Sequence, residues 1–135
     1  MRFAIDSNLI ISSTFKLHTP PALILAAWRA QRFEWVSCTE QMQELTMGLT
    51  RPRVLSLVQG GTGIAQLLLQ EMQSGCNLQI LQKPLPAVCR DARDDFLFAL
   101  LTQGFADMII SGEKDVLAQK GHYPVITARE FLERL

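Results

Sequence analysis

Residues 3–6 read Phe3-Ala4-Ile5-Asp6, and residues 108–113 read Met108-Ile109-Ile110-Ser111-Gly112-Glu113. Each segment begins with a short apolar run of the kind that forms a buried strand, and a carboxylate follows each run within three residues. In an open α/β sheet, ligands bind in the crevice beyond the carboxyl ends of the strands. The two segments therefore predict strands whose ends carry acidic side chains toward a ligand site.

The chain around these two runs alternates between helical and strand patterns. Pro20–Trp28 is predicted to be an apolar helix opened by proline, Glu34–Ser37 a short strand, and Thr62–Ser74 a helix with apolar residues at helical spacing. Leu78–Leu81 is a weak third strand, and Phe96–Leu101 is a helix apolar on most faces and therefore buried. This alternation predicts an α/β fold, a three-layer α/β/α sandwich with a central, mainly parallel sheet.

Local signals indicate where further elements begin. Ser37–Glu40 and Thr127–Glu130 both have the S/T-x-x-E capping-box pattern, which predicts a helix running toward Thr50 and a short closing helix. Tyr123–Ile126 is expected to form a final edge strand. Lys83–Pro86 contains too much proline for a central strand and is expected to be a loop, and a polar turn is expected directly after the first strand.

Composition bounds the classes of protein to consider. The 135 residues, 48% of them apolar, match one domain with its own core, so a single domain is expected over residues 1–135. Thirteen basic residues balance thirteen acidic ones, so any binding of nucleic acid must rest on a local patch. Three irregularly spaced cysteines, an N-terminus unlike a signal peptide and short apolar stretches predict a cytoplasmic protein outside the membrane.

Four carboxylates lie after apolar runs, at the start of a predicted helix or within one: Asp6, Glu44, Asp94 and Glu113. Like charges within a few ångströms raise one another's pKa, so such a cluster near neutral pH indicates Mg²⁺ or Mn²⁺, hard ions that prefer oxygen ligands. Three of these residues also have a simpler interpretation. Asp6 alone could be an exposed turn aspartate that caps the next segment, Glu44 a solvated helical glutamate, and Asp94 a charge that complements a helix dipole.

Five motifs, in this order, resemble the PIN-domain family over the whole chain: Asp6-Ser7-Asn8, Ser37 with Glu44, Asp91–Asp95, Gly104–Asp107 and Ser111–Asp115. The likeness is to the branch of compact bacterial toxins of toxin-antitoxin systems, the VapC-like ribonucleases. Each motif alone is common by chance. The order and spacing of all five make the resemblance specific.

The resemblance implies a metal-dependent endoribonuclease that hydrolyses RNA phosphodiesters with metal-activated water. It implies a catalytic and metal-binding quartet around Mg²⁺ or Mn²⁺: Asp6, Glu44, Asp94 and Glu113. At the last position the family normally has aspartate, so glutamate is a departure whose carboxylate lies about one C–C bond further out. Sites of this kind lose much activity from errors of roughly an ångström.

The resemblance also implies supporting residues and partners. Asp95 and Asp115 are additional candidate metal contacts, Asn8 is expected to orient the first turn, and Ser111 keeps a hydroxyl for a water or phosphate where threonine is more frequent. The expected partners are an RNA substrate, an antitoxin protein and a second copy in a homodimer. Arg51 and Arg53, on either side of Pro52, supply local positive charge for RNA phosphates.

Two other functions fit the sequence. A catalytically weak PIN-like module could bind RNA or protein without cleavage, which Glu113 and the zero net charge favour. Another doubly wound metal-dependent phosphoesterase is the second alternative. Against it, the chain has no D-x-D nucleophile motif, and Gly60–Gly63 lacks the lysine of a phosphate-binding loop.

Overall fold

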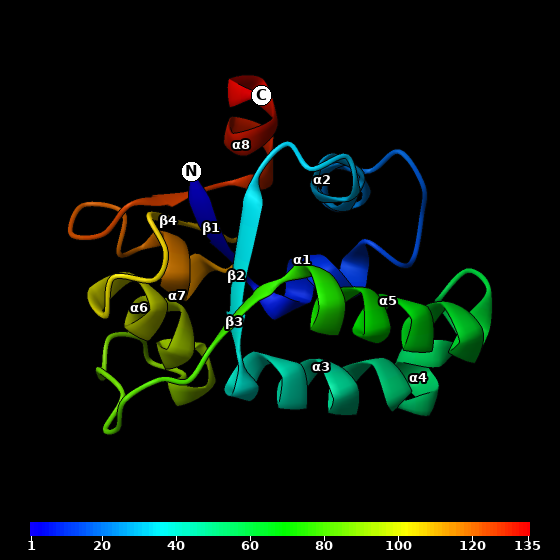
Figure 1. Cartoon of the computed structure of the whole chain (residues 1–135), viewed down its shortest axis with the longest axis horizontal. Coiled ribbons are helices and arrows are strands. Elements are labelled where there is room, and N and C mark those ends of the chain that lie inside the picture. The colour runs from blue at the N-terminus through cyan, green and yellow to red at the C-terminus, as the bar shows by residue number, and fades with distance from the viewer.

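The computed structural model describes residues 1–135 and is built around a five-stranded parallel sheet (Figure 1). The strands are β1 (Arg2–Ile5), β2 (Glu34–Cys38), β3 (Asn77–Gln79), β4 (Met108–Ile110) and β5 (Val125–Ile126). Their order is β3-β2-β1-β4-β5, and every neighbouring pair is parallel. Because the chain moves to one side from β1 through β2 to β3 and returns on the other side through β4, the topological switch point lies between β1 and β4.

Helices connect the strands, and most of them are short. They are α1 (Ser7–Ser12), α2 (Pro20–Arg29), α3 (Thr39–Thr50), α4 (Pro52–Leu55), α5 (Gly61–Gly75), the 3₁₀ turn η1 (Ala92–Asp94), α6 (Asp95–Thr102), α7 (Lys114–Leu117) and α8 (Ala128–Arg134). None of them combines the length and the apolar character that crossing a bilayer requires.

The alternation of side chains along β1 separates two apolar cores. Phe3 and Ile5 point into the core that contains residues of α1, α2, α3, α5 and α8. Ala4, on the opposite face, packs in a second core with the buried helix α6 and Val116 of α7. Helices therefore cover both faces of the sheet, which confirms the predicted three-layer α/β/α sandwich (Figure 1).

Both tryptophans belong to the larger core, as their apolar neighbours in the sequence predict. The rings of Trp28 and Trp35 meet edge to face, with centroids 4.9 Å apart. Gly75, the last residue of α5, packs so close that an added Cβ would lie 2.8 Å from Cζ2 of Trp28. A larger residue there would displace the tryptophan, so this glycine both ends the helix and makes room for the core.

Most element predictions are confirmed, including the edge strand as β5, the loop over Lys83–Pro86 and the capping box of Thr127 and Glu130. Two are wrong. The polar turn expected after β1 is the helix α1, and Ser37 does not cap α3. Its hydroxyl donates to Oε1 of Gln41 instead, at 2.6 Å, because Ser37 is the fourth residue of β2 and lies buried inside the sheet.

Candidate active site at the carboxyl ends of β1 and β4

Asp6 lies directly after β1 at the switch point, and its side chain is almost completely enclosed, with 2% of the residue exposed. Its backbone N–H donates to the carbonyl of Ile110 on β4 at 2.9 Å. Oδ1 accepts a bond from the backbone N–H of Asn8 at 3.0 Å, and Oδ2 accepts one from the Ser111 hydroxyl at 2.6 Å. Asp6 therefore does cap the helix that follows it, as the simpler interpretation expected, but it is buried rather than exposed.

Ser111 and Asn8 join the first acidic motif to the last. The Ser111 hydroxyl is fully buried, donates to Asp6 and accepts the backbone N–H of Glu113 at 3.0 Å. The amide of Asn8 donates to Oε1 of Glu113 at 2.5 Å. Asn8 thus contacts Asp6 through its backbone and Glu113 through its side chain. The longer arm of Glu113, compared with aspartate, ends on this amide.

The carboxylates of the predicted quartet influence one another. Burial raises the pKa of Asp94 to about 7, and the negative charges of Asp6, Glu113 and Glu44 raise it as well. Burial also raises the pKa of Asp6, although its hydrogen bonds from Ser111 and Asn8 act in the opposite direction. The fold therefore brings all four acidic side chains into one electrostatic environment.

A cavity of about 490 Å³ opens where Asn8, after β1, meets Glu113, after β4. It is lined by Glu44 of α3, Asp94 of η1, Glu113 after β4, and Asn8 of α1, while the buried Asp6 does not reach its surface. Arginine also reaches this cavity, from two different elements of the fold. The cavity is thus a mixed-charge hollow at the switch point, where doubly wound folds bind ligands.

Most of the other candidates from the sequence lie outside this cavity. Asp95 is 7% exposed, and its Oδ1 accepts bonds from the backbone N–H groups of Val88 and Cys89, each at 3.2 Å. It therefore braces the loop before η1. Asp115 is exposed on α7, and of the two arginines expected to contact RNA, Arg51 lines the cavity whereas Arg53 does not.

Gln41 is a residue of the site that sequence reasoning missed. It is fully buried, and its Nε2 donates to the carbonyl of Ile5 at 2.5 Å and to the Ser7 hydroxyl at 3.3 Å. These bonds attach α3 to the end of β1, one turn before Glu44 on the helix. The only signal in the sequence is that Gln41 precedes Leu45 and Leu49 in an i, i+4, i+8 row, the buried face of α3.

The chemistry of these side chains fits a hard divalent ion, because three carboxylates line one cavity and the buried Asp6 lies close enough for its charge to act on theirs. Their positions do not yet enclose one. No three carboxylate, histidine or cysteine side chains lie close enough together to hold an ion. Two of the carboxylates are instead bound to neighbours, Asp6 to Ser111 and Glu113 to Asn8.

The protein is thus a doubly wound α/β protein with a carboxylate-lined cavity at the switch point of its sheet. The family model of the PIN domain matches residues 2–115, and the chain belongs to the PIN-domain family. PIN domains are in general metal-dependent nucleases, so membership implies nuclease-type activity and binding of nucleic acid. A comparison with curated proteins gave no match.

Proposed function

We propose that the protein is an endoribonuclease that depends on Mg²⁺ or Mn²⁺ and hydrolyses RNA phosphodiesters in the cavity lined by Glu44, Asp94 and Glu113. The observation that carries this proposal is the gathering of three carboxylates at one cavity beside the buried Asp6, where burial and the like charges together raise the pKa of Asp94 to about 7. Without a cation, a site of this kind retains a proton near neutral pH. A divalent ion relieves the same repulsion and is the cofactor that PIN domains typically use.

In the proposed site, Asp6 and Asp94 hold the ion, and Glu44 and Glu113 complete the ligand set. The chemistry that Mg²⁺ or Mn²⁺ would supply there is a lowered pKa of water and compensation of the charge on the leaving oxygen. The protein's own contribution is orientation. Ser111 holds one oxygen of Asp6 in place, and Asn8 holds Glu113 at the cavity wall.

Two further acidic residues, Asp95 and Asp115, are proposed to act only through water, since neither lines the cavity. Arg51 and Arg53 are proposed to contact RNA phosphates, and the position of Arg51 on the cavity supports its part in this. The location that we propose is the cytoplasm.

The biological role that we propose is that of the toxin in a bacterial toxin-antitoxin pair, inhibited by an antitoxin protein. Its support is the resemblance of the five ordered motifs to toxins of the PIN-domain family. A small DNA-binding protein encoded in the neighbouring reading frame is the expected genetic sign.

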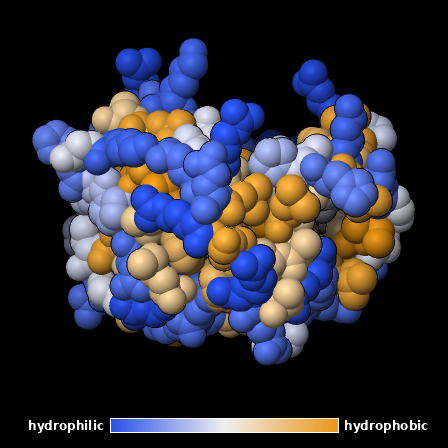
Figure 2. All heavy atoms as spheres, turned by 90° about the horizontal axis from the view of Figure 1, so that it is seen from above, coloured by the Kyte–Doolittle hydropathy of each residue, from blue (hydrophilic) through white to orange (hydrophobic).

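A homodimer is the proposed assembly. An apolar hollow of about 460 Å³ between α2 and α8 supports it, lined by Leu23, Ala26, Ala27, Ala30, Leu132 and Leu135, with Arg32 at its side. Figure 2 views the molecule from the side on which α2 and α8 lie in Figure 1, and hydrophobic atoms gather on this face between hydrophilic ones. Exposed apolar patches often mark interfaces, and size-exclusion chromatography with light scattering measures the assembly directly.

The central test is cleavage of labelled RNA by Asp6→Asn in Mg²⁺ or Mn²⁺. We expect the variant to lose activity by roughly 10³-fold or more, because it removes one charged oxygen from the centre of the proposed ligand set. Circular dichroism should show an unchanged fold. Cleavage at the wild-type rate by the variant would identify a contaminating nuclease and contradict the proposal.

A matched control is Asp107→Asn, which makes the same chemical change outside the cavity. Asp107 pairs with Arg2 at 3.1 Å on the surface, near the start of β1. We expect its activity to stay within about twofold of the wild type, since a change remote from the reacting groups leaves transition-state binding intact.

The second candidate function is a PIN-like module that binds RNA or protein without cleaving RNA. The observation that favours it is the contact between Asn8 and the long arm of Glu113, in a site where no three ligands are gathered. Calorimetry with Mn²⁺ discriminates between the two functions. RNA binding without measurable Mn²⁺ binding would favour the module.

A further inference from the structure

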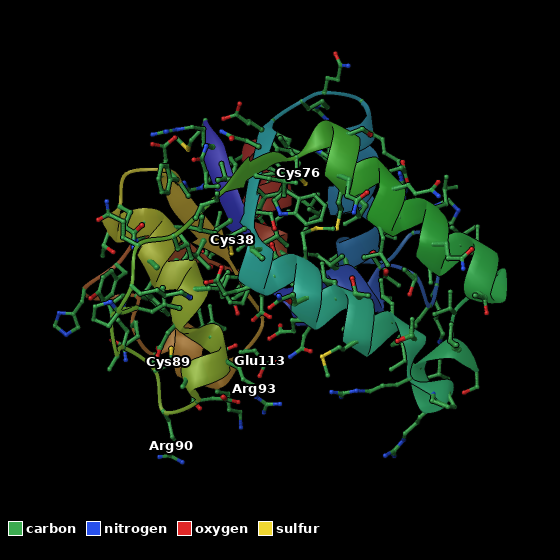
Figure 3. The ribbon with its side chains drawn as sticks, turned by 60° about the horizontal axis from the view of Figure 1, so that its bottom comes forward. Cys38, Cys76, Cys89, Arg90, Arg93 and Glu113 are labelled. Carbon is green, nitrogen blue, oxygen red and sulfur yellow. The ribbon has the colours of Figure 1, made fainter.

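Arg93 shares the cavity with the carboxylates. It belongs to η1, directly before Asp94, and lines the same hollow as Glu44, Asp94 and Glu113. Figure 3 shows Arg93 beside Glu113 at the lower side of the molecule. A cation is thus placed at an otherwise acidic cavity, where a polyanionic substrate would enter.

Asp91 holds the guanidinium of Arg93. Nε donates to both carboxylate oxygens at 3.1 Å, and Nη2 donates to Oδ2 at 2.7 Å. The same aspartate accepts the backbone N–H of Arg93 at 2.9 Å and so caps η1. Nη1 makes no hydrogen bond within the protein, and 76% of the arginine side chain is exposed.

This arrangement contributes little to stability, because an exposed ion pair between residues two apart is worth little in water. Its physical effect is to restrict the guanidinium to one direction before a ligand arrives. A planar guanidinium with free N–H groups matches the oxygens of a phosphate better than a point charge does. Since the chain has no net charge, attraction of a polyanion to this acidic cavity must come from such local cations.

We propose that Arg93, oriented by Asp91, is a phosphate-contacting residue of the cavity and binds a backbone phosphate of RNA beside the site of cleavage. The proposal rests on the proposed ribonuclease function for its choice of ligand. It adds a residue that is neither one of the predicted metal ligands nor one of the predicted RNA-binding arginines. Arg51, at the boundary of α3 and α4, lines the same cavity. In this proposal it contacts a further phosphate of the same RNA molecule.

The same loop supplies a matched control. Arg90 has the same charge, lies three residues before Arg93 and is also exposed, but it does not line the cavity. In Figure 3 its side chain projects away from Glu113 into solvent. If RNA binding depended only on the total charge of the loop, loss of either arginine would weaken it equally. If a phosphate is bound in the cavity, only loss of Arg93 would weaken it.

The experiment measures the anisotropy of a fluorescent single-stranded RNA of about twelve nucleotides, a length within the range that one small domain covers. Arg93→Gln and Arg90→Gln are compared in the Asp6→Asn background, so that the RNA stays intact. Arg93→Gln should weaken binding roughly 3- to 10-fold at ~50 mM salt and reduce the slope of log K against log[salt] by about 0.7 for the lost phosphate contact. Arg90→Gln should change binding by less than about twofold.

Equal binding by Arg93→Gln and its parent, with equal salt slopes, would overturn the proposal, and so would equal losses from Arg90→Gln and Arg93→Gln. Absence of RNA binding by the parent would overturn it too. Thermal melting checks that the exposed substitutions leave the fold intact. The ribonuclease proposal fails separately, if wild-type protein binds RNA through Arg93 but cleaves none in Mg²⁺ or Mn²⁺.

Discussion

The strand-end half of the acidic cavity and its helical half are built in different ways. At the strand ends, hydrogen bonds connect Asp6, Ser111 and Glu113 to one another and to the sheet. In the helical half, Glu44 on α3 and Asp94 in η1 accept no side-chain hydrogen bond that would hold their carboxylates. The strand-end half is thus organised before a ligand arrives, whereas the helical half can still move toward one by changes of side-chain rotamer.

Breaking the organised half should have the largest effect. Ser111→Ala removes the donor to Oδ2 of Asp6 and the acceptor of the Glu113 N–H. We expect nuclease activity to fall about 10- to 100-fold, the usual cost of losing a residue that orients a ligand. Unfolding in urea should show a loss of roughly 1–3 kcal/mol, because a buried carboxylate oxygen is left without its donor.

Ser111→Thr is the matched control, since it keeps the hydroxyl and is the residue more frequent in the family. Its activity should stay within about threefold of the wild type if the hydroxyl is what matters. Equal activity of Ser111→Ala and the wild type would contradict the idea that the strand-end half is organised through this side chain.

In the metal-free protein, the raised pKa of Asp94 in the helical half should make stability depend on pH. The pKa of Asp94 is raised from 3.8 to about 7, so the folded state binds more protons than the unfolded state between these values. Stability therefore falls as pH rises from about 4 to 7, and the loss is complete above pH 7. Asp94→Asn should remove about 2 kcal/mol of this loss at pH 8, allowing for solvent screening of a half-buried group, and little at pH 4.

Chemical denaturation at several pH values in the presence of a chelator measures this difference. Asp107→Asn is the control of opposite sign, because Arg2 lowers the pKa of Asp107 and its pairing is lost as pH falls. That variant should gain no stability at pH 8. An Asp94→Asn protein with the pH profile of the wild type would show that neither burial nor the charges of the other carboxylates raise the pKa of Asp94.

The smallest effect is expected from Glu44, the member of the quartet that lies on α3. Glu44→Gln should lower activity by roughly tenfold with unchanged stability, since no hydrogen bond of the fold depends on it. Glu40→Gln, one turn earlier, is the matched control. Glu40 also lines the cavity, but its carboxylate pairs with Lys83, which lowers its pKa. Equal losses of nuclease activity in the two variants would contradict a special role for Glu44 over Glu40.

The sequence predicted the parts of the molecule that depend on near neighbours. The apolar runs before Asp6 and Glu113 are strands, Trp28 and Trp35 are core residues, and Thr127 begins a capped helix. The alternation of strands and helices along the chain was sufficient to predict a sheet with two covered faces, because the crossovers between parallel strands place helices on those faces. These results need only the spacing of residues a few positions apart.

The environment of each carboxylate depends on tertiary contacts rather than on its neighbours in the sequence. Asp94 and Asp95 are adjacent in the chain, yet the first faces the cavity with a pKa near 7 and the second is buried and binds the backbone of a loop. In the same way, Gln41 resembles any polar residue of a surface helix until its contacts with Ile5 and Ser7 are known. No local pattern distinguishes such neighbours.

By itself, the sequence determined the order of strands and helices along the chain, the two apolar faces of the sheet and the positions of acids at strand ends. Only the tertiary structure decided which acids meet, which one accepts hydrogen bonds from its neighbours and which has the pKa raised to about 7. The physical reason is distance along the chain. The bonds that organise the site, from Ser111 to Asp6 and from Asn8 to Glu113, each join residues 105 positions apart, so they exist only once β1 and β4 lie side by side.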